Sequence, residues 1–421
     1  MTDDQARPRS RRDFLTGAGL VGAGALLAGD LRPGFPLPPG LMPLGLVPLG
    51  LVPLGLVPLG LQDKPGLRTL SERPLNAETP VELLDPELTP NEHFFVRNNG
   101  IVPRRALARD LSGWALKIDG EVDRPTDLTV DALRRFPVVQ RAVVIECGGN
   151  GRAGFHPPTP GNQWTLGAVG CAKFEGVRLA DVLRSCGLRK SAVFVAFFGE
   201  DSHLSGNPDK SPISRGVPLA KALDEHTLLA FGMNGVPLPP QHGFPLRLVV
   251  PGWPGSCSGK WLRRLWVRDR EHDGEKMTGS AYRLPKHPVA PGTKVAASDM
   301  AVIEQMPVKS VITGPATGGE HRAAQPLAVR GHAWSGAGDV AAVHLSIDFG
   351  QTWLPCSVKP AVNRYAWQRF TAEIRFPSGG YYEVWARATD HTGRQQPMVV
   401  PGWNPKGYCN NAMHRIAVRV V

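Results

Sequence analysis

The longest uncharged stretch of this chain carries a proline at every fifth position. Residues 41–60 are four pentapeptides, LMPLG followed by three copies of LVPLG, and no charged residue occurs from Pro33 to Leu61. Hydropathy alone would indicate a membrane-spanning helix, but each proline removes a backbone donor and clashes with the preceding turn. We therefore expect an extended, polyproline-like tether, with a segment that touches a membrane or a partner as the alternative. Ordinary globular sequence begins at about residue 76.

The first 30 residues have the pattern of an export signal. Residues 10–15 read Ser-Arg-Arg-Asp-Phe-Leu, and a weakly apolar run rich in Gly and Ala follows at 16–28. Paired arginines before such a run are typical of the twin-arginine pathway, and the run is too short to span a bilayer. We expect a signal peptide at 1–30, a linker at 31–75 and a periplasmic location. A basic, disordered N-terminus is the alternative.

Composition limits the class of protein. Hydrophobic residues make up 42% and charged residues 20% of the chain, which is typical of a globular protein. Six cysteines in 421 residues, with no C-x-x-C pair, argue against a disulfide scaffold, a zinc ribbon, a thioredoxin motif and a c-type haem site. The formal net charge of +11 suits an anionic substrate or an acidic partner. No nucleic-acid-binding motif accompanies this charge, so we expect no nucleic acid partner.

The globular part changes character at about residue 300. Residues 76–290 mix predicted strands with an amphipathic helix at 177–187, which Gly187 ends. The predicted strands of this part lie at 114–120, 141–146, 193–199 and 247–252. This mixture favours the α+β class.

After residue 300 the pattern consists of short alternating strands without helices. They are predicted at 343–353, 372–376, 382–390 and 415–421. In the first of them, Val343, Leu345, Ile347 and Phe349 are expected to share one face. We therefore expect an immunoglobulin-like β-sandwich at 291–421.

Cys147 ends a predicted strand and precedes a glycine-rich loop, AVVIECGGNGR at 142–152. Glycines allow tight turns and the close approach of a ligand, so this thiolate could face a bulky group. A buried structural cysteine is the alternative. Because one thiolate cannot hold a catalytic metal alone, the other ligands would come from a cofactor. A hydrolase nucleophile with His156 or His203 is another alternative, which no orienting partner at a suggestive spacing supports.

Several long stretches, in one order, resemble the sulfite oxidase family of molybdenum enzymes, and most of all its haem-free bacterial periplasmic sulfite dehydrogenases. They include HFFVRNN (93–99), ECGGNGR (146–152), MNGVPLPPQHGFPLRLVVPGW (233–253) and NPKGYCNNAMHR (404–415). The resemblance covers roughly residues 80–421. It implies a molybdopterin-binding domain at 76–290, followed by a sandwich domain through which two copies form a homodimer.

In that family, a dioxo molybdenum atom is bound by one pterin dithiolene and by one cysteine thiolate, and Cys147 stands at the matching position. The resemblance implies five residues around a small anion: Arg97, Arg152, Trp164, Tyr282 and Lys406. It implies that the pterin and its phosphate are held by Phe95, Val96, Arg97, Asn98, Asn99, Asp201, His242, Arg247, Ser258, Gly259 and Lys260, with His203 able to take part in place of Asp201. Guanidinium and ammonium groups suit the binding of a dianion.

The implied function is that of a sulfite dehydrogenase, which oxidises sulfite to sulfate. Without a haem module or a C-x-x-C-H motif, no haem is expected, and electrons would leave one at a time to a separate c-type cytochrome. A sulfoxide reductase or nitrate reductase of the same fold is an alternative. A non-catalytic exported binding module is an alternative from another class.

Overall fold

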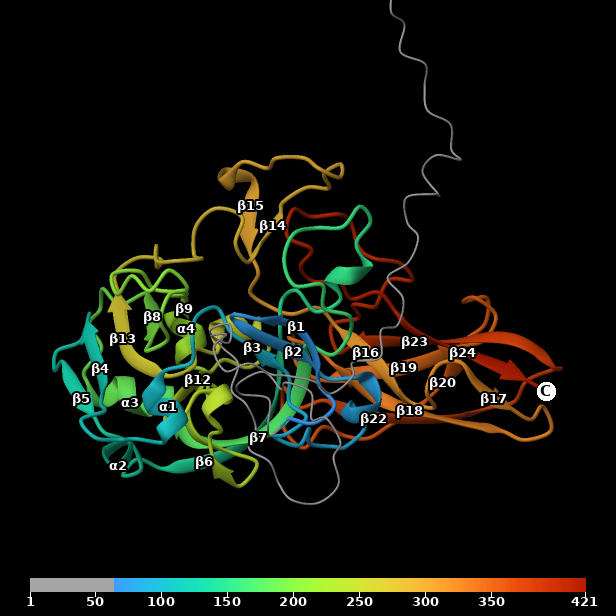
Figure 1. Ribbon diagram of the computed structural model, residues 1–421, viewed down its shortest axis with the longest axis horizontal. Helices are drawn as coiled ribbons and strands as arrows, with labels where there is room; N and C mark the ends of the chain where they lie inside the picture. Colours follow the sequence, from blue (N-terminus) through green and yellow to red (C-terminus); the bar gives the residue numbers. More distant parts are fainter. Residues whose placement is uncertain (1–63) are drawn as a thin grey trace, which may run out of the picture. The chain divides into compact units, whose positions relative to one another are not determined.

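The computed structural model describes residues 64–421. The predicted signal peptide and the LVPLG repeats therefore lie outside the described residues. Figure 1 shows that strands dominate the described part and that its helices are short. Between residues 64 and 421, no helix is both long enough and apolar enough to cross a bilayer.

The first sheet joins residues 68–78 to the loop that begins at Phe95. It contains β1 (Arg68–Glu72), β2 (Leu75–Glu78) and β3 (Val96–Arg97), in that order and all antiparallel. Asn76 stands opposite Arg97 in the register. The Asn76 side chain also accepts a hydrogen bond from the backbone N–H of Asn98, at 2.9 Å. Residues 68–78 therefore lie along one side of the loop formed by residues 95–99 and hold it in place.

The second sheet carries Cys147 at the end of one of its strands. The strand order is β11-β10-β7-β6, and β12 also pairs with β10. The strands are β6 (Val138–Glu146), β7 (Val169–Arg178), β10 (Leu228–Met233), β11 (Val236–Pro237) and β12 (Arg247–Val249). The last five residues of β6 are all buried, so the sheet enters the core immediately before Cys147.

The third sheet has the order β5-β4-β13-β8-β9 and packs against helix α3. Its strands are β4 (Leu116–Gly120), β5 (Thr126–Leu128), β8 (Phe194–Gly199), β9 (Gly216–Pro218) and β13 (Leu262–Arg268). The predicted strands of the first part correspond to β4, β6, β8 and β12. The short hairpin of β14 (Arg283–Pro285) and β15 (Met300–Val302) follows this sheet in the chain.

Helix α3 (Leu179–Ser185) is the predicted helix, and it is shorter than predicted. Val177, expected on its apolar side, belongs to β7 instead, whereas Leu179, Val182 and Leu183 are fully buried. Gly187 has φ of 71°, a left-handed value that commonly follows a helix end. The other helices are α1 (Arg104–Ala108), α2 (Val130–Leu133) and α4 (Leu219–Ala222), and the short 3₁₀ helices are η1 (Val81–Leu84), η2 (Arg152–Gly154), η3 (Pro240–His242), η4 (Gly255–Cys257) and η5 (Ala297–Asp299).

Two further sheets form the predicted β-sandwich, and the mixed part before it is α+β, as expected. One sheet has the order β16-β18-β22-β21 and the other β17-β24-β23-β19-β20. Their strands are β16 (Lys309–Gly314), β17 (Gly319–His321), β18 (Leu327–Trp334), β19 (Val340–Ser346), β20 (Leu354–Pro355), β21 (Ser357–Val358), β22 (Gln368–Ile374), β23 (Gly380–Asp390) and β24 (His414–Val420). Apolar side chains from both sheets fill the space between them.

The predicted strand at 343–353 was wrong beyond residue 346. Val343 and Leu345 are buried in β19 as expected, but Phe349 is 57% exposed and has φ of 58°. The Ser346 hydroxyl accepts a hydrogen bond from the N–H of Gly350, and the Asp348 carboxylate accepts one from Thr352. These side chains stabilise a turn and end the strand, although the apolar alternation continues.

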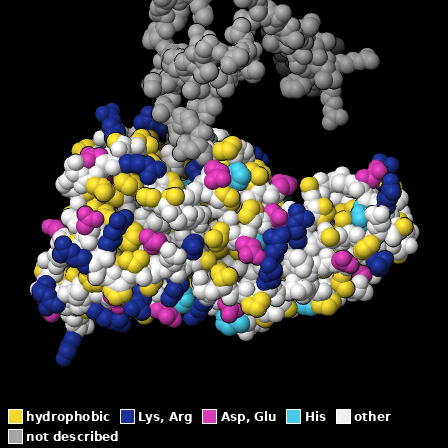
Figure 2. Space-filling model, turned by 90° about the horizontal axis from the view of Figure 1, so that it is seen from below, with side chains coloured by type: hydrophobic (Ala, Val, Ile, Leu, Met, Phe, Trp, Pro, Cys, Tyr) yellow, Lys and Arg dark blue, Asp and Glu magenta, His cyan; other side chains and the backbone are white. Residues whose placement is uncertain are grey.

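Charge on the surface is mixed. On the face that Figure 2 shows, Lys and Arg side chains are interspersed with Asp, Glu and hydrophobic side chains. Another group of basic residues lies inside a cavity and not on this surface.

Candidate active site

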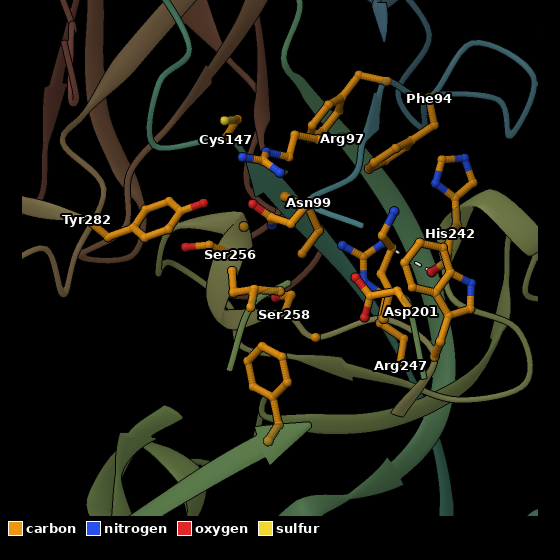
Figure 3. A pocket seen from close by; sticks show the side chains of 18 residues that line it. Phe94, Arg97, Asn99, Cys147, Asp201, His242, Arg247, Ser256, Ser258 and Tyr282 are labelled. Carbon is orange, nitrogen blue, oxygen red and sulfur yellow. Dashed lines mark hydrogen bonds between the residues drawn. The ribbon is translucent and has the colours of Figure 1, made fainter. Parts of the chain in front are cut away.

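One cavity brings together residues from distant parts of the chain. It is partly open to solvent, and its lining combines apolar side chains with several basic ones. The residues predicted for the site that line it are Phe95, Arg97, Asn99, Cys147, Asp201, His242, Arg247, Ser258, Gly259, Lys260 and Tyr282. Figure 3 shows Cys147, Arg97 and Tyr282 in one part of the cavity and His242, Arg247 and Asp201 in another.

Cys147 is held by the backbone of its glycine-rich loop. Its N–H donates to the carbonyl of Ala168, and its carbonyl accepts from the N–H of Asn150, at 2.9 and 2.8 Å. Gly151 adopts a left-handed φ of 89°, which turns the chain back toward η2. The Cys147 side chain is 8% exposed. The strand end and the turn therefore fix a nearly buried thiol at the cavity wall.

Arg97 lies beside Cys147 and Tyr282. Burial lowers the pKa of the Arg97 guanidinium, but the Tyr282 phenol and the Cys147 thiol more than offset this and raise it above its ordinary value. Arg97 therefore stays charged next to the thiol. The Tyr282 hydroxyl points toward the same part of the cavity (Figure 3). A cation, a phenol and a thiol together form a place where a small anion can bind.

Arg215, which was not predicted from the sequence, contacts two lining residues of this part of the cavity, Tyr282 and Ser256. Its guanidinium carbon lies 4.4 Å from the centroid of the Tyr282 ring, a cation–π distance. Its Nη1 donates to the Ser256 hydroxyl, which lines the cavity, at 2.5 Å. The Tyr282 ring also stacks on Tyr408, with centroids 5.3 Å apart. The sequence indicates this role only in that Arg215 is the single charged residue of the stretch SPISRGVPLA at 211–220.

The other part of the cavity is rich in cations and poor in carboxylates. Burial, together with the charges of Arg247 and Arg97, holds the pKa of Lys260 well below its ordinary value. Burial alone lowers the pKa of Arg247 to about 10. Burial also raises the pKa of Asp201, the carboxylate among these residues, to about 6. Among the residues that line the cavity, Arg97, Arg247 and Lys260 are accompanied by one carboxylate, Asp201, so an anion bound here would offset the excess of basic groups.

A buried donor of the lining also favours a ligand that accepts hydrogen bonds. Arg247 Nε has no hydrogen-bond partner among the described residues. Lys260 donates to Asn98 Oδ1 and, at 2.9 Å, to the carbonyl of Gln241, so it joins the 95–99 loop to η3. Leaving a buried donor without a partner costs about 1–3 kcal/mol. The cavity therefore fits a bulky ligand that has an anionic end and accepts several hydrogen bonds.

Three residues predicted around the anion do not line the cavity. The Arg152 guanidinium donates to the carbonyls of Lys406 and Asn162, at 2.7 and 2.8 Å, and is 5.4 Å from the Tyr408 ring centroid. Lys406 therefore contacts Arg152 through its backbone carbonyl oxygen. Trp164 is buried and faces the Phe95 ring edge-on, with centroids 6.4 Å apart. In this structure the three residues support the cavity wall and do not form it.

Val96, Asn98 and His203, which were predicted to hold the cofactor, also lie outside the lining. Val96 is fully buried in a cluster with Leu75 and Ala77. Asn98 reaches the site through Lys260, as described above. His203 Nδ1 pairs with the Ser205 hydroxyl at 2.8 Å in the loop after β8, so it takes no part in the cavity. His156 is exposed, and neither histidine lines the cavity, which leaves the hydrolase alternative without support.

A buried ion pair holds the strand end that precedes Cys147. Lys309 Nζ lies 2.7 Å from Glu146 Oε1, and the two side chains are 3% and 2% exposed. Trp334 Nε1 donates to Glu146 Oε2, and Asn150 Nδ2 donates to Glu146 Oε1, at 2.8 and 3.0 Å. Lys309 and Trp334 belong to the sandwich. Residues of the sandwich therefore fix the position of the residue next to Cys147.

The loop after Cys147 is held from the same side. The N–H of Cys409 donates to the carbonyl of Gly148, and Asn410 Nδ2 donates to the carbonyl of Gly151, at 2.9 and 2.7 Å. Sequence reasoning missed these contacts and the Glu146 pair. The only signal for the pair is a charged residue that ends an apolar run, AVVIE at 142–146.

The other cysteines are poor candidates for a thiolate ligand. All six cysteines are free. Burial raises the pKa of Cys171 and of Cys409 to about 12, so both stay protonated near neutral pH. Within residues 64–421, no group of three His, Cys, Asp or Glu side chains could hold a metal ion.

Two parts of the chain match known protein families. Residues 100–276 match the family described as the oxidoreductase molybdopterin binding domain. Residues 300–421 match the family described as the Mo-co oxidoreductase dimerisation domain.

The chain is similar over most of its length to curated sulfite oxidases. It is 36% identical over 367 residues to sulfite oxidase of Gallus gallus, a match that covers 83% of this chain and 77% of the chicken protein. It is 34% identical over 371 residues to mitochondrial sulfite oxidase of Homo sapiens, covering 85% of this chain and 66% of the human protein. The chain thus spans about two thirds to three quarters of the length of these animal relatives.

Other relatives have names that indicate other activities. The chain is 32% identical over 387 residues to nitrate reductase [NADH] 1 of Oryza sativa, which covers 84% of this chain and 41% of that protein. Among solved structures, it resembles the sulfane dehydrogenase SoxCD from Paracoccus pantotrophus, with a TM-score of 0.66 and 29% identity over 82% of this chain and 84% of that one.

Proposed function

Since the chain belongs to the sulfite oxidase family of molybdopterin oxidoreductases, we propose that it oxidises sulfite to sulfate at a molybdenum–pterin centre ligated by Cys147. The observation that carries this proposal is the joint placement of Cys147 and Arg97 in a cavity whose other end holds Arg247 and Lys260. A thiol for the metal, a cation for the substrate and a cationic end for the cofactor are the three features that such a centre needs.

The residues present fit the cofactor. The Cys147 thiolate is a soft ligand suited to such a metal. Arg247, Lys260 and His242 would hold the anionic end of the pterin, where Arg247 Nε lacks a partner among the described residues. When bound, the cofactor supplies two-electron redox chemistry and oxygen-atom transfer.

The chain itself binds and orients the substrate. Conversion of sulfite to sulfate adds one oxygen atom derived from water and releases two protons and two electrons. The Arg97 guanidinium offers paired N–H donors to the sulfite oxygens and fixes which side of the anion faces Cys147. The Tyr282 hydroxyl is a third donor, held in place by the contacts of its ring with Arg215 and Tyr408. These hydrogen-bond donors are already in position before the substrate binds, so the protein rearranges little during the reaction.

Replacing Arg97 with alanine is expected to raise the KM for sulfite by about 10- to 100-fold, because a charge-assisted contact worth roughly 1.5–3 kcal/mol is lost. Steady-state kinetics across sulfite concentrations measures this change. Arg104→Ala is the matched control, since Arg104 follows the same loop but is exposed and outside the cavity. A KM within twofold of the unmodified value for Arg97→Ala would mean that this guanidinium does not bind the substrate.

We further propose that the electrons pass one at a time to an external c-type cytochrome, as in the haem-free bacterial dehydrogenases that the sequence resembles. Sulfite-dependent reduction of cytochrome c, with ferricyanide as the artificial acceptor, tests this step. About two cytochrome molecules should be reduced per sulfite consumed, since each carries one electron. Reduction of nitrate or a sulfoxide by the reduced enzyme, with no sulfite oxidation, would favour the reductase alternatives.

We propose that residues 1–30 direct export of the folded protein by the twin-arginine route to the periplasm and that the sandwich domain occupies 291–421. The linker expected at 31–75 cannot extend to residue 75, because Lys64 is buried and β1 (Arg68–Glu72) pairs in the first sheet. We therefore propose a linker that ends before Lys64 and a catalytic domain that begins there and extends to about residue 290. The match of residues 300–421 to a dimerisation domain supports a homodimer.

A further inference from the structure

Lys64 is the first basic residue after the LVPLG repeats, and it is buried. No Lys or Arg occurs between Arg32 and Lys64. The Lys64 side chain is 6% exposed, and its Nζ lies 2.6 Å from the carbonyl oxygen of Asn91 and 3.1 Å from that of Phe94. The same Nζ lies 2.7 Å from Nε2 of His242. A lysine in a surface linker would normally be exposed to water. The burial of Lys64 therefore indicates that its side chain has a specific role.

The contact with His242 fixes the hydrogen-bonding roles of that side chain. A protonated lysine has only donors, so the imidazole Nε2 must accept, and Nδ1 carries the only ring N–H of His242. His242 and Phe94 both line the cavity. Lys64 therefore joins the turn before β3 to η3, two walls of the cavity that are distant in the sequence.

The charge of Lys64 acts on the cationic end of the cavity. Burial lowers the pKa of His242 well below its ordinary range, and the charge of Lys64 is the next largest cause, ahead of Lys260 and Arg247. Burial also dominates the lowered pKa of Lys260, to which Lys64 contributes. Each of these cations destabilises the others until an anion binds among them, and each then stabilises that anion.

We propose that Lys64 is a positioning residue of the cofactor site, which holds His242 with Nε2 as an acceptor and adds a positive charge where the anionic end of the pterin binds. The identity of this anion rests on the proposed function. The segment that directly follows the repeats is then part of the cofactor site, through Lys64 and through the sheet in which β1 pairs with β2 and β2 pairs with β3.

The test compares Lys64→Met with the unmodified full-length holoprotein. Each protein is dialysed, and the pterin that stays bound per chain is followed by the fluorescence of its oxidised form. We expect the Met variant to lose pterin about tenfold faster, because one charge-assisted contact no longer supports the site. Lys64→Arg, which keeps the charge and the donors, should release pterin at nearly the unmodified rate.

Arg73→Met is the control, since Arg73 lies exposed in the turn between β1 and β2 and outside the cavity. Thermal unfolding of each variant separates pterin loss from loss of the fold, and if Lys64→Met does not fold, Lys64→Gln replaces it. Release from the Met or Gln variant at the unmodified rate, or equal release from the Met and Arg variants, would overturn the role of Lys64. A folded unmodified protein that carries no pterin would instead overturn the proposed function.

Discussion

Replacing Cys147 with serine should abolish sulfite oxidation while the protein stays folded. A serine hydroxyl has nearly the same volume as the thiol, so the packing at the cavity wall changes little. It does not ionise near neutral pH and offers no soft sulfur ligand. Loss of even an outer partner of a metal ligand typically costs 10- to 100-fold in activity, so we expect more than about a 100-fold fall in kcat.

The measurement is steady-state turnover of sulfite with ferricyanide, together with the midpoint of thermal unfolding. Cys356→Ser provides the control, because Cys356 lies in the sandwich, away from the cavity, and burial raises the pKa of its thiol to about 12. This control should keep full turnover. Normal turnover by Cys147→Ser would remove the thiolate from the mechanism.

The second large effect is expected on stability, from Lys309→Met. The change removes the cation beside Glu146 and leaves a carboxylate buried without its partner. Breaking a buried pair in this way typically costs about 3–5 kcal/mol, which is a large part of the stability of a domain. Because Glu146 directly precedes Cys147, the variant should also bind less molybdenum. Urea unfolding and metal analysis measure the two effects.

Lys359→Met is a matched control in the same domain. Lys359 pairs with Glu87 at 2.8 Å, but these side chains are 64% and 63% exposed. An exposed pair contributes at most about 1 kcal/mol, so this control should barely change the unfolding midpoint. The double variant Glu146→Gln, Lys309→Met removes both charges and should recover much of the stability. Equal midpoints for Lys309→Met and Lys359→Met would show that the Glu146 pair does not hold the loop.

The sequence predicted helices and strands correctly where the local apolar pattern matches the burial found in the structure. The apolar run at 193–199 is β8, and the glycine at 187 follows the end of α3. Phe349 shows where this agreement fails, since its place in an alternating pattern predicts burial and it is exposed. Two polar side chains, Ser346 and Asp348, stabilise a turn there. Their hydrogen bonds decide the local structure, and apolar periodicity carries no information about them.

For the site, motifs predicted which segments meet but not where each side chain points. Cys147, Arg97 and Tyr282 do line one cavity. Arg152 does not line it, and its guanidinium donates to the carbonyls of Asn162 and Lys406. Such partners are fixed only once distant segments have packed.

Lys64 was overlooked for the same reason. Its partner His242 is 178 positions away, and nothing local to residue 64 distinguishes a buried lysine from the end of a linker. A long-range contact between a lysine and a histidine leaves no periodic signal in either segment. Residues that support a site through another side chain are therefore the hardest to predict from sequence.

The content of metal and pterin in purified protein tests the central claim most directly. Elemental analysis and pterin fluorescence should each give about one equivalent per chain in the unmodified protein, and far less in Cys147→Ser. Folded protein that oxidises sulfite with neither molybdenum nor pterin, or a Cys147→Ser variant with full content and turnover, would contradict it.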